Sequence, residues 1–113
     1  MKTYKLEKYG NTYEIALVKG NYQNGGALYV GMWVVENGEL VEPWNDLTVN
    51  VPMSGAHDNL TLIDTNNNGK DIMKWLKDNK LGTETMFSAS SGYCVYPLFL
   101  FKKKVVEEMI PME

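Results

Sequence analysis

The chain has 113 residues, a net charge of −3 and a single cysteine. This length fits one domain over residues 1–113, and the 44% apolar content is ordinary for a globular core. A charge so close to neutral lacks the basic excess of nucleic-acid-binding proteins and the dense carboxylates of a DNA mimic. The composition therefore argues against nucleic acid as a partner.

The single cysteine, Cys94, allows no internal disulfide bond, which favours a reducing compartment. The first residues lack the apolar segment of a signal peptide. The longest apolar run, Leu98–Phe101, is too short to span a bilayer. We therefore expect a cytoplasmic protein that does not enter a membrane.

The first third of the chain predicts strands. Thr3–Tyr9 and Thr12–Val18 flank a Gly10-Asn11 turn, and the second segment alternates apolar and polar residues, so the pair predicts a hairpin. Ala27–Val35 is apolar on both faces and predicts a central strand. Asn37-Gly38 follows at once and suits a tight hairpin turn, because both residues tolerate positive φ.

The next segments continue the strand pattern. Leu40–Glu42 begins a return strand, and Pro43 should break or bend its pairing because proline donates no hydrogen bond. Asp46–Val51 alternates, with Leu47, Val49 and Val51 predicted inward and Thr48 and Asn50 outward. Leu60–Ile63 is a short apolar strand that leads into the Asp64 cluster.

One helix is predicted from about Gly69 to Asn79. Asn66, Asn67 or Asn68 can cap it, and Gly82 is the expected left-handed stop. Its predicted buried stripe consists of Ile72, Met73 and Leu76.

The last third predicts a hairpin or a bulged strand pair within Thr83–Phe101, with Pro97 at an edge or bulge. The apolar spacing after Lys104 predicts a short closing helix that ends at Pro111. The expected fold class is α+β: an antiparallel sheet of five to seven strands, one main helix packed on one face, and this short C-terminal helix.

The run from Asp64 to Gly69 matches the first half of a calcium loop, but Trp75 stands where the closing carboxylate is needed. We therefore interpret this run as a strand-to-helix turn in which Asp64 and the asparagines satisfy backbone amides, and we predict no metal. Cys94 lies in an apolar run and is interpreted as a packing residue, although His57 could pair with it in a nucleophilic site.

The first half is rich in aromatic residues, and the acidic balance favours packing over base stacking. Tyr22 and Trp44 differ because they lie in polar or proline-broken segments. Exposed aromatic side chains are efficient anchors of protein interfaces, so we expect these two to belong to a contact surface.

Several blocks of residues 47–101, about half the chain, resemble a small domain-of-unknown-function family carried largely on plasmids, conjugative elements and prophages of Gram-positive gut bacteria. The blocks are Leu47-Thr48-Val49-Asn50, Asp64-Thr65-Asn66-Asn67, Leu81-Gly82, Ser91-Gly92-Tyr93-Cys94 and Tyr96-Pro97-Leu98. The family has no established reaction, so the resemblance implies no catalytic residues. It does imply a mobile-element protein, and such proteins commonly block host defence, as anti-CRISPR proteins do.

We therefore predict a protein that is not an enzyme, needs no cofactor, and binds a bacterial defence protein such as a CRISPR effector. The predicted partner-binding residues are Tyr22, Asn24, Trp44, Asn45, Asp46, Asp64, Asn66 and Asn67. The alternative is a small-molecule-binding domain or an enzyme with a polar pocket around Asp64, Asn66, Ser91 and Tyr93. Edge strands beside Pro43 or Pro97 could also pair two copies into a homodimer.

Overall fold

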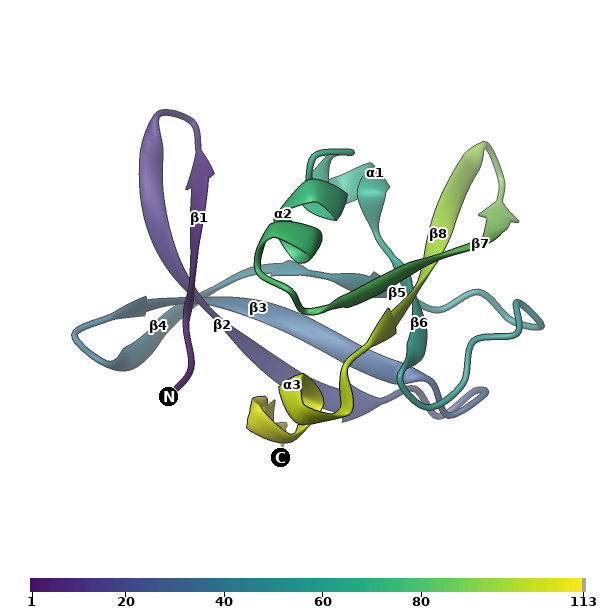
Figure 1. Ribbon diagram of the computed structural model, residues 1–113, viewed down its shortest axis with the longest axis horizontal. Helices are drawn as coiled ribbons and strands as arrows, with labels where there is room; N and C mark the ends of the chain where they lie inside the picture. The colour runs from purple at the N-terminus through teal and green to yellow at the C-terminus, as the bar shows by residue number, and fades with distance from the viewer. Residues whose placement is uncertain (113) are drawn as a thin grey trace.

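The structure, a computed structural model, describes residues 1–112 (Figure 1). Its strands are β1 Tyr4–Lys8, β2 Asn11–Asn21, β3 Leu28–Glu36, β4 Glu39–Asp46, β5 Thr48–Val49, β6 Leu60–Ile63, β7 Gly82–Ser91, β8 Cys94–Phe101 and β9 Ile110–Pro111. Its helices are α1 Thr65–Asn68, α2 Ile72–Asp78 and α3 Lys103–Glu108. Within these described residues, no helix has both the length and the apolar character needed to cross a membrane.

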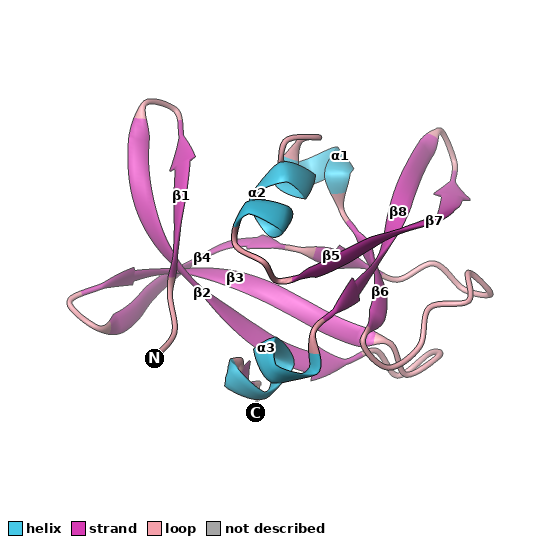
Figure 2. Ribbon diagram, in the orientation of Figure 1, coloured by secondary structure: helices cyan, strands magenta, loops and turns pink. Residues whose placement is uncertain are grey.

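The strands form two sheets (Figure 2). The first has the order β1-β2-β3-β4, with β9 added parallel to β2, and the second has the order β5-β6-β8-β7. The predicted mixture of antiparallel strands and helices is confirmed. The predicted single sheet of five to seven strands is wrong, because the chain leaves the first sheet after Asp46 and enters the second at Thr48.

The two predicted hairpins of the first sheet are confirmed. Asn37 and Gly38 adopt φ values of 53° and 78°, as their tight turn requires. Pro43 is tolerated because β4 is an edge strand, and β4 continues through it instead of breaking. The register of β4 against β3 shifts between Pro43 and Asn45, so Trp44 is the extra residue of a bulge.

The predicted single helix is divided. Gly69, at φ 84°, separates α1 from α2. The expected caps Asn66, Asn67 and Asn68 are wrong, because they lie inside α1 and its cap is Asp64, whereas α2 starts at Asp71 without a side-chain cap bond. The apolar stripe of α2 is confirmed at Ile72 and Leu76, and Trp75 is buried beside them.

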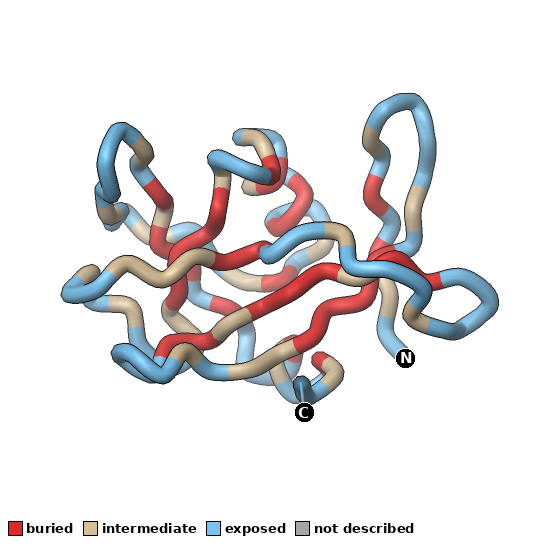
Figure 3. Tube along the Cα trace, turned by 180° about the vertical axis from the view of Figure 1, so that it is seen from behind, coloured by how far each residue is buried: buried red, intermediate tan, exposed pale blue. Residues whose placement is uncertain are grey.

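Buried segments converge where the two sheets and α2 meet, while the hairpin tips are exposed (Figure 3). A smaller apolar cluster of Leu62, Tyr96 and Leu98 covers the other face of the second sheet. The C-terminal helix is confirmed as α3, and the chain then pairs with β2 through Ile110 and Pro111. The main core consists of residues from both sheets, from α2 and α3 and from the connections between elements: Tyr4, Leu6, Ile15, Leu17, Leu28, Val30, Met32, Val34, Leu47, Ile63, Ile72, Trp75, Leu76, Leu81, Phe99, Phe101, Val105 and Met109.

Gly82 is required for a different reason from the one predicted. The left-handed residue after α2 is Lys80, at φ 56°, and Gly82 begins β7. A Cβ at Gly82 would stand 2.1 Å from the backbone oxygen of Leu100 and 2.7 Å from the Phe99 ring. Glycine therefore permits the close approach of β7 to β8.

Gly82→Ala should destabilise the protein by about 3 kcal/mol or prevent folding, because its Cβ meets fixed backbone. Gly20→Ala is the matched control. Its Cβ would meet the flexible end of Met112 at 2.9 Å, so the cost should stay within about 1 kcal/mol. Chemical denaturation of both variants measures the difference. Equal stability of the two would contradict this account of Gly82.

Candidate functional site

The predicted partner-binding corner is a polar network that joins the two sheets. The Tyr22 hydroxyl lies 2.8 Å from Oγ1 of Thr48, and the backbone N–H of Val30 donates to the same Oγ1 at 3.0 Å. Thr48 is buried, so its predicted outward orientation is wrong. The reason is that this hydroxyl supplies a partner for a backbone amide at the point where β3 and β5 separate.

Asp46 and Asp64 meet around the side chain of Asn68. Nδ2 of Asn68 donates to the backbone oxygens of both residues at 2.9 Å, and Asn68 is buried. The hydroxyl of Tyr29 donates to Oδ1 of Asp46 at 2.6 Å. Tyr22, Asp46 and Asp64 are therefore brought together as predicted, but largely by internal hydrogen bonds.

The Asp64 run is a strand-to-helix turn, as interpreted from the sequence. Oδ1 of Asp64 accepts the backbone N–H of Asn67 at 3.0 Å, and Oδ2 accepts its side-chain amide at 2.8 Å. The Asp64 carboxylate is buried by this arrangement. Trp75, at the position where a calcium loop closes, donates its indole N–H to the backbone oxygen of Lys5 at 2.7 Å.

The two aromatic residues expected to be exposed are half-buried. The Trp44 ring stacks on Tyr13 with centroids 4.7 Å apart and packs against the main core. The Tyr22 ring contacts Tyr29 edge to face, 5.7 Å apart. Their expected full exposure is corrected by these contacts, whereas their expected role in binding a partner stays a prediction.

The remaining predicted contact residues, Asn24, Asn45, Asn66 and Asn67, are exposed. Trp44, Asn45 and Asn67 line one cavity between β1 and α2.

The residues of the alternative pocket do not line this cavity: Asp64 is buried, Asn66 lies on α1, and Ser91 and Tyr93 lie at the β7–β8 turn. His57 forms a hydrogen bond with the backbone oxygen of Gly55 at 3.0 Å, and Cys94 packs beside the Leu62 cluster.

The β7–β8 hairpin carries an exposed apolar surface that the sequence analysis missed. Met86 is 98% exposed, Phe87 71%, Tyr93 106% and Val95 58%. β7 is the edge of its sheet, and the hairpin stands apart from the β1–β2 hairpin at the other end of the molecule (Figure 1). We refer to Met86, Phe87, Tyr93 and Val95 as the hairpin patch.

A bulge holds Met86 and Phe87 outward. The register of β7 against β8 shifts between Glu84 and Ser88. Thr85 fixes this bulge, because its Oγ1 donates to the backbone oxygen of Leu98 at 2.7 Å and accepts the backbone N–H of Phe87 at 3.1 Å. The predicted bulged strand pair is thus confirmed, with Pro97 opposite Ser88 beside the bulge.

The outer edge of β7 is open for pairing. Gly92, at φ 62°, and Tyr93 form a two-residue turn that closes on Ser91 and Cys94. Peptide groups alternate sides in an antiparallel pair, so those of Ser88 and Ser90 face away from β8. Of the two positions predicted for Pro97, an edge or a bulge, the structure has the bulge, because β8 pairs with both β6 and β7. Pro43 does lie in an edge strand.

The sequence does contain a signal for this surface, which is a stretch without charged residues. No charged residue stands between Glu84 and Lys102. Proteins usually protect an edge strand from unwanted pairing with charged side chains or proline. Beyond Glu84, the exposed part of β7 has neither, so its outer edge is not protected in these two ways.

A family model described as Domain of unknown function (DUF4313) matches residues 16–112. The chain belongs to the DUF4313 family. The match includes the second sheet, with the whole β7–β8 hairpin, and most of the first sheet; it leaves out β1 and the start of β2. It confirms the resemblance to an uncharacterised family. Comparisons with curated proteins and with solved structures found no match.

Two phenols of the corner network in this DUF4313 domain have raised pKa values. Burial is the largest cause for both Tyr22 and Tyr29, and for Tyr29 the hydrogen bond to Asp46 and the Asp46 charge add to it. The folded protein therefore holds these protons more tightly than the unfolded chain, where tyrosine has a pKa of 10.0. This contribution to stability is complete below that pH and is lost as the pH rises above it.

We expect Tyr29→Phe to lower the stability at neutral pH by about 1 kcal/mol, because Asp46 loses its donor. The variant should also show a shallower fall in melting temperature from about pH 9 to about pH 11 than the parent, since one raised phenol is gone. Circular dichroism melts over this range measure both effects. Tyr9→Phe changes an exposed phenol and should follow the parent curve. If the melting temperature of Tyr29→Phe fell as steeply with rising pH as that of the parent, the link between the raised pKa of Tyr29 and stability would be disproved.

Proposed function

We propose that this DUF4313 protein is a non-enzymatic binding protein of a mobile genetic element. In this proposal it inhibits a bacterial defence effector by protein–protein contact, as anti-CRISPR proteins do. The observation that carries the proposal is the pair Met86 and Phe87, held outward by Thr85 on an uncharged stretch of an edge strand. The mobile-element origin and the defence target rest on the family resemblance.

The hairpin patch has the physical properties of a protein-binding surface. Met86 and Phe87 are large side chains, and burying each against a partner gains about 1.5–3 kcal/mol before the cost of association. Thr85 holds the bulge in one conformation, so less conformational entropy is lost on binding. The partner would present an apolar groove for these two side chains.

The main chain of β7 supplies a second kind of contact. The peptide groups of Ser88 and Ser90 face the open side of the sheet, as the register with Pro97 and Val95 requires. An extended segment of the partner could add to this edge as a further strand. Main-chain hydrogen bonds would then align the partner, and the Met86 and Phe87 side chains would give it specificity.

The test uses a purified CRISPR effector and its target-cleavage assay. The parent protein should inhibit cleavage stoichiometrically, with inhibition complete near one equivalent per effector. Met86→Ala/Phe87→Ala should weaken binding roughly 30-fold or more, as expected when two central anchors are removed. Its melting temperature should not change, because both side chains are exposed.

Val41→Ala is the matched control, since Val41 is an exposed apolar residue on β4 of the other sheet. It should bind like the parent. Thr85→Ala removes the hydroxyl that holds the bulge and should weaken binding while Met86 and Phe87 are still present. Inhibition at amounts far below one equivalent would indicate an enzyme and contradict the proposal. Undiminished binding by the double variant would exclude the hairpin patch.

A further inference from the structure

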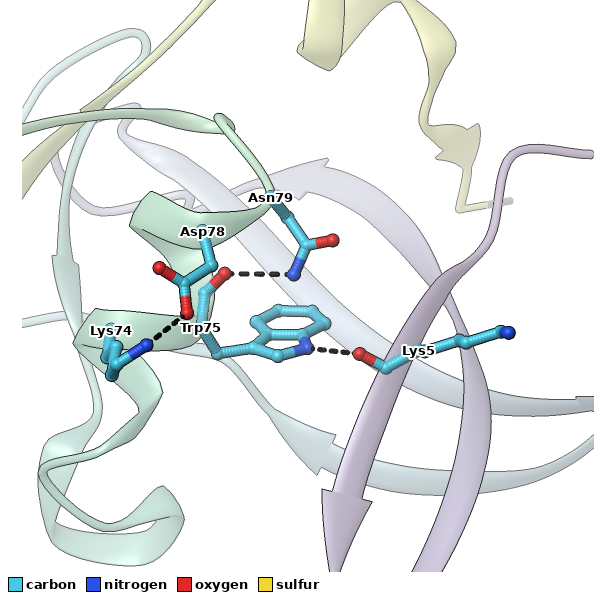
Figure 4. Close-up of polar contacts among 5 residues, drawn as sticks. All are labelled: Lys5, Lys74, Trp75, Asp78 and Asn79. Carbon is cyan, nitrogen blue, oxygen red and sulfur yellow. Dashed lines mark hydrogen bonds and ion pairs between the residues drawn. The ribbon is translucent and has the colours of Figure 1, made fainter.

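A cavity of about 400 Å³ lies between the open edge of β1 and the two helices α1 and α2. Two contacts hold these elements together at its ends. The indole N–H of Trp75 donates to the backbone oxygen of Lys5 at 2.7 Å (Figure 4), and Nζ of Lys8 donates to the backbone oxygen of Asn68 at 3.1 Å. The volume falls within the range of small-ligand sites, about 300–1,000 Å³.

Aromatic and apolar side chains form much of the cavity wall. Trp44 and Trp75 line it from β4 and α2, and Leu6 and Ile72 add apolar surface. Trp44 is backed by Tyr13, so its ring is held in place without a ligand. Such walls suit a ligand with a flat or apolar ring.

The charges around the cavity balance. Three lysines line it, Lys5, Lys8 and Lys74, and so do three carboxylates, Glu7, Asp71 and Asp78. Lys74 pairs with Asp78 at 2.6 Å (Figure 4), and Lys8 lies 3.8 Å from Asp71. Because the lysines and carboxylates are equal in number, the cavity has no net charge that would select a phosphate or another strongly charged group.

Four carboxamides supply the specific polar groups. Asn45, Asn67, Asn68 and Asn79 all line the cavity. Nδ2 of Asn68 already donates to two backbone oxygens, whereas its Oδ1 is buried and has no partner among the described residues. A buried acceptor without a partner is costly. Because this oxygen has almost no accessible surface, a ligand donor could pair with it only if the Asn68 side chain turned toward the cavity.

We propose that this cavity binds an uncharged nucleobase or nucleoside. Such a ligand has a flat ring that packs against tryptophan and an edge of donors and acceptors that matches carboxamides. It carries no net charge, in agreement with the paired lysines and carboxylates. An extended peptide fits less well, because Trp75 already occupies the β1 edge at Lys5. The cavity shares no lining residue with the hairpin patch, so this inference is independent of the proposed protein binding.

The experiment is a titration of the ¹⁵N-labelled protein with adenosine, guanosine, cytidine and uridine, with the three tryptophan indole signals as the readout. At least one nucleoside should shift the signals of Trp44 and Trp75 with millimolar affinity or better. The Trp33 signal should stay in place, because Trp33 does not line the cavity. The 5′-monophosphate of that nucleoside should bind no more tightly than the nucleoside itself.

Asn45→Ala and Asn24→Ala form a matched pair, since both asparagines are exposed and only Asn45 lines the cavity. Asn45→Ala should weaken nucleoside binding by about 5-fold, because one hydrogen bond to the ligand is lost. Asn24→Ala should bind like the parent. No shift of Trp44 and Trp75 with any nucleoside would overturn the proposal. Shifts of Trp33 as large as those of Trp44 and Trp75 would also overturn it, and so would much tighter binding of the monophosphate. Glucose is the control ligand, and a protein that responds to glucose but to no nucleoside would overturn the proposal as well.

Discussion

The whole structure depends on one buried residue, Leu47, at which the chain passes from the first sheet to the second. Its N–H donates to the backbone oxygen of Val30 in β3, and its carbonyl accepts the N–H of Asp64 at the end of β6, at 2.8 and 2.9 Å. Leu47 thus pairs its backbone N–H with the first sheet and its backbone C=O with the second, while its side chain is fully buried in the shared core. Because buried backbone groups must be paired, the two sheets cannot separate here without leaving polar groups unsatisfied.

Asp46 and Thr48, on either side of Leu47, complete this connection between the two sheets, which we call the joint. Oγ1 of Thr48 accepts a hydrogen bond from a backbone N–H of the first sheet. The side-chain amide of Asn68 donates to the backbone oxygens of Asp46 and Asp64. These hydrogen bonds hold α1 against the crossing point and so place α2 opposite β1. The cavity between β1 and α2 therefore exists because the joint fixes where the helices begin. Oδ1 of Asn68, which has no hydrogen-bond partner within residues 1–112, is part of the same arrangement.

The joint also leaves two hairpins, β1–β2 and β7–β8, standing at opposite ends of the molecule (Figure 1). Each is anchored at its base by core residues such as Leu6 and Phe101, while its tip is exposed. The hairpin patch and the cavity consequently lie on different elements of one scaffold.

Local signals in the sequence were sufficient for most of the strands, but not for the division of the predicted helix at Gly69. Turn residues such as Asn37-Gly38 and alternating apolar residues predicted both hairpins of the first sheet, because these signals act over a few residues. The Asp64 turn and the apolar stripe of α2 were also predicted, since capping and helical periodicity are local. The division into two sheets was not, because the pairing partners of Leu47 lie far apart in the chain.

The candidate site shows the same division. The sequence predicted that Tyr22, Asp46 and Asp64 belong together, but it could not show that Thr48 and Asn68 hold them from inside. Nor could it show that Met86 and Phe87 face solvent, because an apolar pair in a strand is ordinarily core and only the Thr85 bulge turns it outward. By itself the sequence determined most of the strands and the tight turns, which depend on neighbouring residues. Only the tertiary structure decided which apolar and polar side chains are buried, because burial depends on contacts between distant segments.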